Sequence, residues 1–268
     1  MATAIGSGAG ATGDVNPTRP SAAESTATIA EKIQNGRLLG VGVVLAYGVA
    51  KWDYFSRSPH TADEGWFQAD TEAGGADKLG HFYASHLLTD LFSTQYQQWG
   101  YDQRKAGRSG AMSSFLLMGM MEAGDSFSDY GYSSEDMLMN LLGSFIGYQR
   151  FVSDDWHRRV DFRVEHNLDG GNNDPFTDYQ RIKFLMAIKL DGFDSLRGTG
   201  LEWLELNLGY FSRGYGNDEV IDTRTIYLGV GFNLARLFER SGWHRTAAAL
   251  HYVQVPKTSI TVEHKLPD

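Results

Sequence analysis

The residues best suited to chemistry lie within 77–147, where charged and small polar side chains interrupt apolar helical patterns. Asp77 and His81 are four residues apart, and Glu122 and Asp125 are three apart, so each pair shares one face of a helix. A carboxylate beside an imidazole suits general-base catalysis, metal ligation or a structural ion pair. If the two helices are neighbours, these four side chains form one cluster whose oxygen and nitrogen ligands suit zinc or manganese.

The same residues also have an adequate structural explanation. Lys78 can pair with the acids, and His81 can be a hydrogen-bonded polar group inside a small bundle. Spacing alone does not establish that ligands converge, and a metal site needs three or more that do. We therefore expect a structural polar core rather than chemistry, and assign no catalytic residue, metal ligand or cofactor. This core comprises Asp77, Lys78, His81, Glu122, Asp125, Asp136 and Asn140. The candidates for catalysis or a divalent metal are Asp77, His81, Glu122 and Asp125.

Apolar residues spaced three and four apart predict the helices of the first half of the chain. The predicted helices cover residues 36–55, 76–99, 109–127 and about 134–151. Gly100 is suited to ending the second helix, Asp102 to capping the third, and Ser133 or Ser134 to capping the fourth. Gly143 and Gly147, four residues apart, predict a close helix contact.

Beyond a polar stretch at 153–176, the apolar pattern changes from helical to alternating, which predicts strands. These strands cover residues 179–190, 201–211 and 223–234, with a last strand or pair over 247–255 and 260–264. A short helix is expected over residues 233–240. The predicted fold class is therefore α+β, a compact apolar helical bundle followed by a four- to five-stranded antiparallel meander.

This pattern divides the chain into four parts. We expect a disordered leader at 1–35, a helical domain at 36–152, a linker at 153–176 and an antiparallel sheet at 177–268. So few strands do not close into a transmembrane barrel, which needs about eight. The sheet must instead bury a face on the helices, a partner or a membrane surface, and we favour the helices. We expect its aromatic residues to be ordinary sheet packing, with contact to a membrane interface or a glycan as the alternative; they are Trp203, Tyr210, Phe211, Tyr215 and Tyr227.

Composition limits the compartment and the class of partner. The net charge of −9 argues against nucleic-acid binding, which needs a basic face. With no cysteine, the chain has no disulfide, thiolate nucleophile or lipid-anchored cysteine. No signal peptide starts at Met1, and the apolar run at 38–49 is short of the ~20 residues that cross a bilayer.

Several spaced motifs resemble a known family. They are Asp77-Lys78-x-Gly80-His81, Glu122-x-x-Asp125 with Phe127-Ser128, and Gly131-Tyr132-Ser133 leading to Asp136, Asn140 and Gly143. In this order, over residues 36–151, they resemble the YfiM-like family of predicted periplasmic lipoproteins, which have no assigned activity. The opening motif is also similar to the Asp-Lys-x-x-His start of VanZ-like membrane proteins. The resemblance implies a periplasmic or outer-membrane-associated protein of a Gram-negative cell envelope.

The leading functional hypothesis is thus a non-enzymatic envelope protein with a structural or binding role. One alternative is a metal-assisted envelope hydrolase that acts on lipid or glycan at the Asp/His/Glu cluster. Another is an assembly partner of an outer-membrane complex that docks through the aromatic sheet. A membrane surface or an envelope protein is the expected partner, and the sequence does not indicate an oligomeric state.

Overall fold

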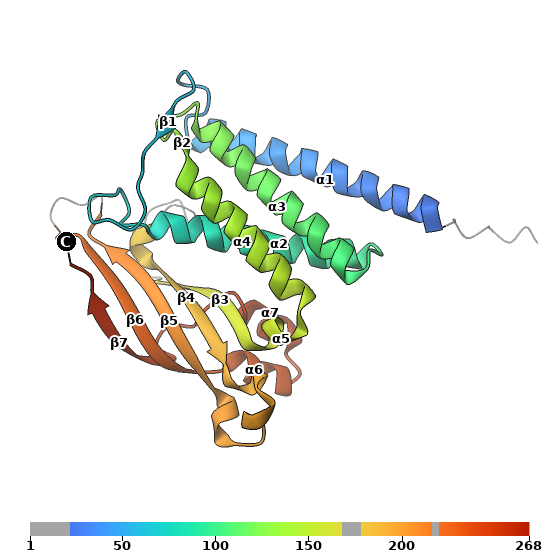
Figure 1. Cartoon of the computed structure of the whole chain (residues 1–268), viewed down its shortest axis with the longest axis vertical. Coiled ribbons are helices and arrows are strands. Elements are labelled where there is room, and N and C mark those ends of the chain that lie inside the picture. Colours follow the sequence, from blue (N-terminus) through green and yellow to red (C-terminus); the bar gives the residue numbers. More distant parts are fainter. Residues whose placement is uncertain (1–21, 168–177, 216–219, 268) are drawn as a thin grey trace, which may run out of the picture.

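The computed structural model describes residues 22–167, 178–215 and 220–267, and these ranges form a helical layer packed on an antiparallel sheet. The four long helices are α1 (Ala22–Lys51), α2 (Ala76–Gln98), α3 (Gln103–Asp125) and α4 (Ser134–Val152). In Figure 1, α1, α3 and α4 lie above the sheet, and α2 crosses behind α4. The α+β class is confirmed.

The sequence signals that begin and end these helices act as predicted. The Asp102 side chain accepts a hydrogen bond from the Lys105 amide and caps α3, and Ser133 accepts one from Asp136 and caps α4. Gly100 follows α2 with a φ of 113°, a conformation that favours glycine. The helices pack closely because a Cβ at Gly143 would lie 2.2 Å from the Phe82 carbonyl oxygen of α2.

The five-stranded sheet has the order β3-β4-β5-β6-β7, and neighbouring strands are antiparallel. Its strands are β3 (Val160–His166), β4 (Ile182–Lys189), β5 (Leu204–Arg213), β6 (Thr223–Phe232) and β7 (Ser259–Lys265). Short helices α5 (Asp154–Arg159), α6 (Leu234–Arg240) and α7 (His244–Leu250) flank them. A two-residue parallel pair, β1 (Thr61–Ala62) with β2 (Tyr132–Ser133), ties the loop before α2 to the start of α4.

Four expectations about the chain's organisation are corrected. Helix α1 begins at Ala22, so part of the expected 1–35 leader is helical; residues 1–21 lie outside the described residues. The expected linker at 153–176 contains α5 and β3, although residues 168–177 are not described. Residues 247–250 belong to helix α7 rather than to a strand. Among the described helices, Thr26–Lys51 is long and apolar enough to cross a membrane, a test that a signal sequence or a core helix also passes.

The sheet buries less of its apolar face than expected. Helix α2 covers part of the sheet: Phe82 contacts Phe162 of β3, Tyr83 contacts Phe184 of β4, and Ala76 shares a core cluster with Tyr210 of β5. Ordinary packing of the aromatic residues is confirmed for Tyr210, Phe211, Tyr215 and Tyr227, which are buried, and the alternative of an exposed aromatic contact surface is wrong for these four. The exposed apolar side chains of β5, β6 and β7 are mostly aliphatic, and Leu208, Leu228 and Val262 form one row across these three strands.

Candidate functional site

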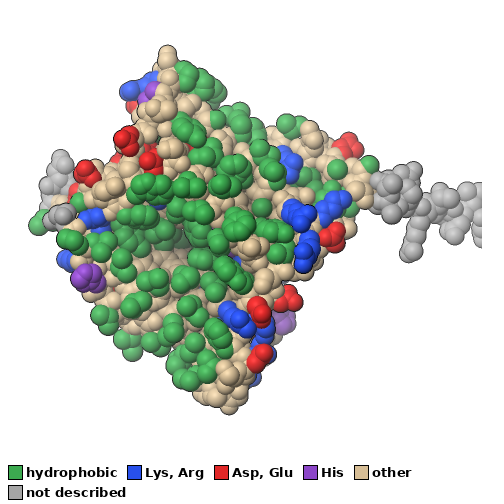
Figure 2. All heavy atoms as spheres, in the orientation of Figure 1, with side chains coloured by type: hydrophobic (Ala, Val, Ile, Leu, Met, Phe, Trp, Pro, Cys, Tyr) green, Lys and Arg blue, Asp and Glu red, His purple; other side chains and the backbone are tan. Residues whose placement is uncertain are grey.

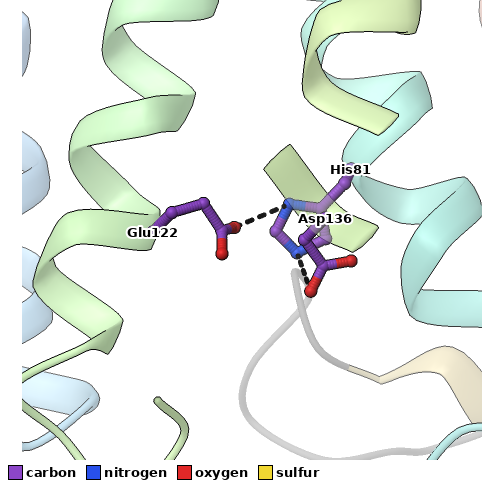
Figure 3. A group of neighbouring side chains, drawn as sticks. All are labelled: His81, Glu122 and Asp136. Atoms are coloured by element: carbon purple, nitrogen blue, oxygen red, sulfur yellow. Dashed lines mark ion pairs between the residues drawn. The ribbon is translucent and has the colours of Figure 1, made fainter. Parts of the chain in front are cut away.

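The start of α2, the end of α3 and the start of α4 meet in a buried polar cluster. Lys78, Glu122 and Asp136 are at most 4% exposed, and His81 is partly exposed beside them. The β1–β2 pair positions the loop that adds Glu64 to the cluster. Two of the four candidate residues, His81 and Glu122, therefore converge, and Asp136 joins them from the predicted polar core (Figure 3).

Lys78 is the centre of one half of the cluster. Its ammonium donates a hydrogen bond of 2.6 Å to Asp77 Oδ2 and another to Glu64, and lies 3.0 Å from Asp136 Oδ1. Although burial opposes the charge, the pKa of Lys78 is raised because Asp77 and Asp136 favour the ammonium form. Asp77 thus has the ion-pairing role expected of the structural core.

His81 occupies the other half, between two carboxylates (Figure 3). Its Nδ1 lies 3.3 Å from Glu122 Oε1 and 3.3 Å from Asn140 Oδ1, and its Nε2 lies 3.7 Å from Asp136 Oδ2. The Ser85 hydroxyl donates a 3.0 Å hydrogen bond to the same Asn140 oxygen, which fixes that side chain. Three helices therefore contribute polar atoms around one imidazole ring.

Two acids of the cluster, Glu122 and Glu64, have a raised pKa. Burial, followed by the charges of Asp136, Asp125 and Glu64, raises the pKa of Glu122 to about 9. Burial and a hydrogen bond with Asp136 raise the pKa of Glu64. Carboxyl groups this close to one another repel when they are ionised. Either one of them keeps its proton, or a nearby cation compensates the charge.

Asp125 lies outside this convergence. Its side chain is hydrogen-bonded to Tyr54, which follows α1, and burial raises its pKa to about 7. Neither group of potential metal ligands in the described residues includes it: one is His81, Glu122 and Asp136, and the other is Glu64, Asp77 and Asp136. The sequence could not exclude Asp125, because three residues of helical spacing place it on the same face as Glu122.

An open pocket of about 430 Å³ reaches the edge of the cluster at Glu64. Its other acidic lining residues are Asp53, Asp63, Glu72 and Asp129, and its aromatic ones are Trp52 and Tyr130. An acidic, partly aromatic pocket is suited to a cation rather than to an anionic ligand.

A second polar network, which the sequence did not reveal, joins the helices to the sheet. Asp161 of β3 is fully buried and accepts hydrogen bonds from Arg150 (2.9 Å), Arg163 (2.7 Å) and Lys189 (2.8 Å). The Arg150 guanidinium also donates a 2.6 Å bond to Asp90 of α2. The alternating charged residues of β3 could have indicated a strand with one polar face, but they lay in the segment that we expected to be a linker. Each charged group of the network has at least one partner of opposite charge within it, which indicates a structural role, although Arg163 Nε and Glu205 Oε2 make no hydrogen bond.

The fold and the cluster define a class of α+β protein with a polar-centred helical bundle on an antiparallel sheet. Residues 63–152, about a third of the chain, match a family described as "Predicted periplasmic lipoprotein (DUF2279)". That range contains α2, α3, α4 and the cluster residues. The match supports a location in the cell envelope and does not test the YfiM-like or VanZ-like names. No curated protein and no solved structure matches the chain.

Proposed function

We propose that this chain is a non-enzymatic envelope protein that lies on a lipid membrane through an aliphatic face. This lipid-facing surface consists of the exposed side chains of the sheet and of α4. On the sheet these are Leu206, Leu208, Ile226, Leu228, Val230, Phe232, Ile260 and Val262, and on α4 they are Leu138, Leu141, Leu142 and Phe145.

The proposal rests on the distribution of side chains on these elements, in which the apolar side chains are exposed and the polar ones are buried. On α4, the exposed apolar residues recur with a helical period, whereas the buried face contains Asp136, Asn140, Ser144 and Arg150. On β5, Leu206 and Leu208 are exposed, whereas Glu205 and Asn207 are buried. A protein in water normally buries its aliphatic face, because exposing apolar area costs about 25 cal/mol per Å².

Figure 2 shows the extent of this surface. Hydrophobic side chains spread over α4 and down onto the strands, and most charged side chains lie toward the edges of this view. Contiguous apolar patches of more than a few hundred Å² mark sites of membrane or protein contact.

Two observations favour lipid over a protein partner. Helix α1 is long and apolar enough to cross a bilayer, and its Leu38, Leu39 and Val43 are exposed. The family matched by residues 63–152 is described as a lipoprotein family, and lipoproteins are held at a membrane surface.

Site-specific fluorescence on the full chain tests the proposal. Because the chain has no cysteine, Val262→Cys creates one labelling site on the lipid-facing surface, and Thr261→Cys creates a matched site on the opposite face of the same strand. Both positions are exposed, so neither substitution should disturb folding. With vesicles of phosphatidylethanolamine and phosphatidylglycerol, an environment-sensitive dye at 262 should shift to the blue and be quenched by nitroxide-labelled acyl chains.

The dye at 261 should show neither change. Equal responses at the two positions would contradict face-on binding, since α1 alone could then hold the protein on the vesicles. A blue shift at 262 without vesicles that grows with protein concentration would indicate a second copy as the partner and would overturn the proposal.

A further inference from the structure

We propose that His81, Glu122 and Asp136 form a binding site for a divalent transition-metal cation of the zinc class. One imidazole with carboxylate oxygens is a ligand set that zinc and manganese accept, and the chain has no cysteine that would favour softer ions. This inference is independent of the lipid-facing surface, which lies on other side chains.

The distances are close to those of a coordination shell. One ligand atom from each residue lies within 4.8 Å of the others. An imidazole binds one ion through one nitrogen, and His81 Nδ1 lies 3.3 Å from Glu122 Oε1. In a tetrahedral zinc site with bonds of about 2.0 Å, neighbouring ligand atoms are about 3.3 Å apart. Asp136 Oδ2 lies 3.7 Å from the other nitrogen, Nε2, so the Asp136 carboxylate must turn toward Nδ1 to complete the ligand set.

The burial of Glu122 is a second observation that points to a cation. Its side chain is 1% exposed and points toward the imidazole, and its Oε1 makes no hydrogen bond; the ion-pair partner of this oxygen is His81, 3.3 Å away. A buried carboxylate oxygen without a hydrogen bond is costly. Asn140 Oδ1, 3.3 Å from the same His81 nitrogen, offers a further neutral oxygen beside it.

The neighbouring group of acids does not need an ion. The ammonium of Lys78 already contacts Glu64, Asp77 and Asp136 and occupies the position that a cation would take among them. Glu122, in contrast, makes its ion pair with His81, whose charge depends on protonation. The site therefore lies on the His81 side of Asp136, away from Lys78.

Zinc titration of the full chain after chelator treatment tests this site. We expect one zinc ion to bind by isothermal titration calorimetry, and Glu122→Gln to weaken its binding at least tenfold. Asp125→Asn is the matched control on the same helix, because Asp125 bonds to Tyr54 and is not a ligand. It should leave zinc affinity unchanged within about twofold.

X-ray absorption at the zinc edge of the unmutated protein supplies a result that does not depend on a folded variant. The spectrum should show a single imidazole with oxygen ligands, and His81→Ala should remove the imidazole signal. Absence of zinc binding, two or more imidazoles, or an imidazole that survives His81→Ala would overturn the proposal. A site formed by other members of the chain's eight histidines would give either of the last two results.

Discussion

Asp161→Asn tests whether the buried ionic network holds the helices to the sheet. Asp161 contacts Arg150, Arg163, Lys189 and His251 at 2.7–2.9 Å. Burial alone would raise its pKa, but Lys189, His251 and Arg163 hold it well below the usual range. The carboxylate is therefore ionised in the folded protein at neutral pH, and the amide removes that charge with little change in shape.

The magnitude follows from charge balance. Three carboxylates, those of Asp90, Asp161 and Glu205, face three basic side chains, those of Arg150, Arg163 and Lys189. All six residues are at most 4% exposed. Removing one partner from a buried ionic group typically costs about 3–5 kcal/mol. That loss is a large share of the roughly 5–15 kcal/mol that stabilises a typical domain.

Urea unfolding at pH 7, followed by tryptophan fluorescence, measures the loss. Lys189→Met should also destabilise, but the double variant should lose about 1–3 kcal/mol less than the sum, because the two groups contact each other. Asp194→Asn, an exposed acid that pairs with Arg158 and Arg197, should cost less than about 0.5 kcal/mol. A loss below about 1 kcal/mol for Asp161→Asn, or strict additivity with Lys189→Met, would refute this reasoning.

Three further predictions concern the helices. Gly143→Ala should destabilise by about 1–3 kcal/mol in urea because its Cβ would meet α2, whereas Gly119→Ala, with 3.4 Å to its nearest neighbour, should be neutral or slightly stabilising. In the presence of a chelator, Glu122 of the folded protein keeps its proton up to about pH 9, whereas Glu122 of the unfolded chain loses it near pH 4.5. The free energy of unfolding should therefore fall by about 1–3 kcal/mol from pH 5 to 8. Glu122→Gln should reduce that dependence, and the part that remains comes from Asp125 and Glu64, whose pKa values are also raised. Burial, and then Arg150, lowers the pKa of His86 to about 3, so stability should also fall as pH drops below about 6.5, and His86→Leu should flatten this acid limb.

The helices were predictable because their signals are local. Caps at Asp102 and Ser133, the glycine after α2 and the three-four apolar spacing all depend on neighbours within a turn or two. Strands β4, β5 and β6 followed from alternation in the same way. Strand β3 was missed because Asp161, Arg163 and Glu165 made an alternating strand look like a polar linker. Asp161 and Arg163 pair with each other, but their further partners, such as Lys189 and Glu205, are distant in sequence.

The cluster was predictable in part. His81 and Glu122 were candidates for one cluster if their helices were neighbours, and they lie 3.3 Å apart. The choice of Asp136 over Asp125 depends on how α3 and α4 rotate, and Tyr54 holds Asp125 on another side. Glu64 enters through the β1–β2 pair, which is too short to leave a sequence signal.

The helical period alone does not decide which face of a helix is inside. The spacing of Leu138, Leu141, Leu142 and Phe145 identified α4, and the usual assumption places such a stripe in the core. In the fold, this stripe is exposed and the stripe of Asp136, Asn140, Gly143 and Gly147 is buried. The small residues allow α2 to approach closely, and the polar ones bond across the contact, as in helix pairs surrounded by lipid. The same inversion therefore underlies both proposals, since it turns aliphatic side chains toward lipid and gathers the groups that would bind a cation in the interior.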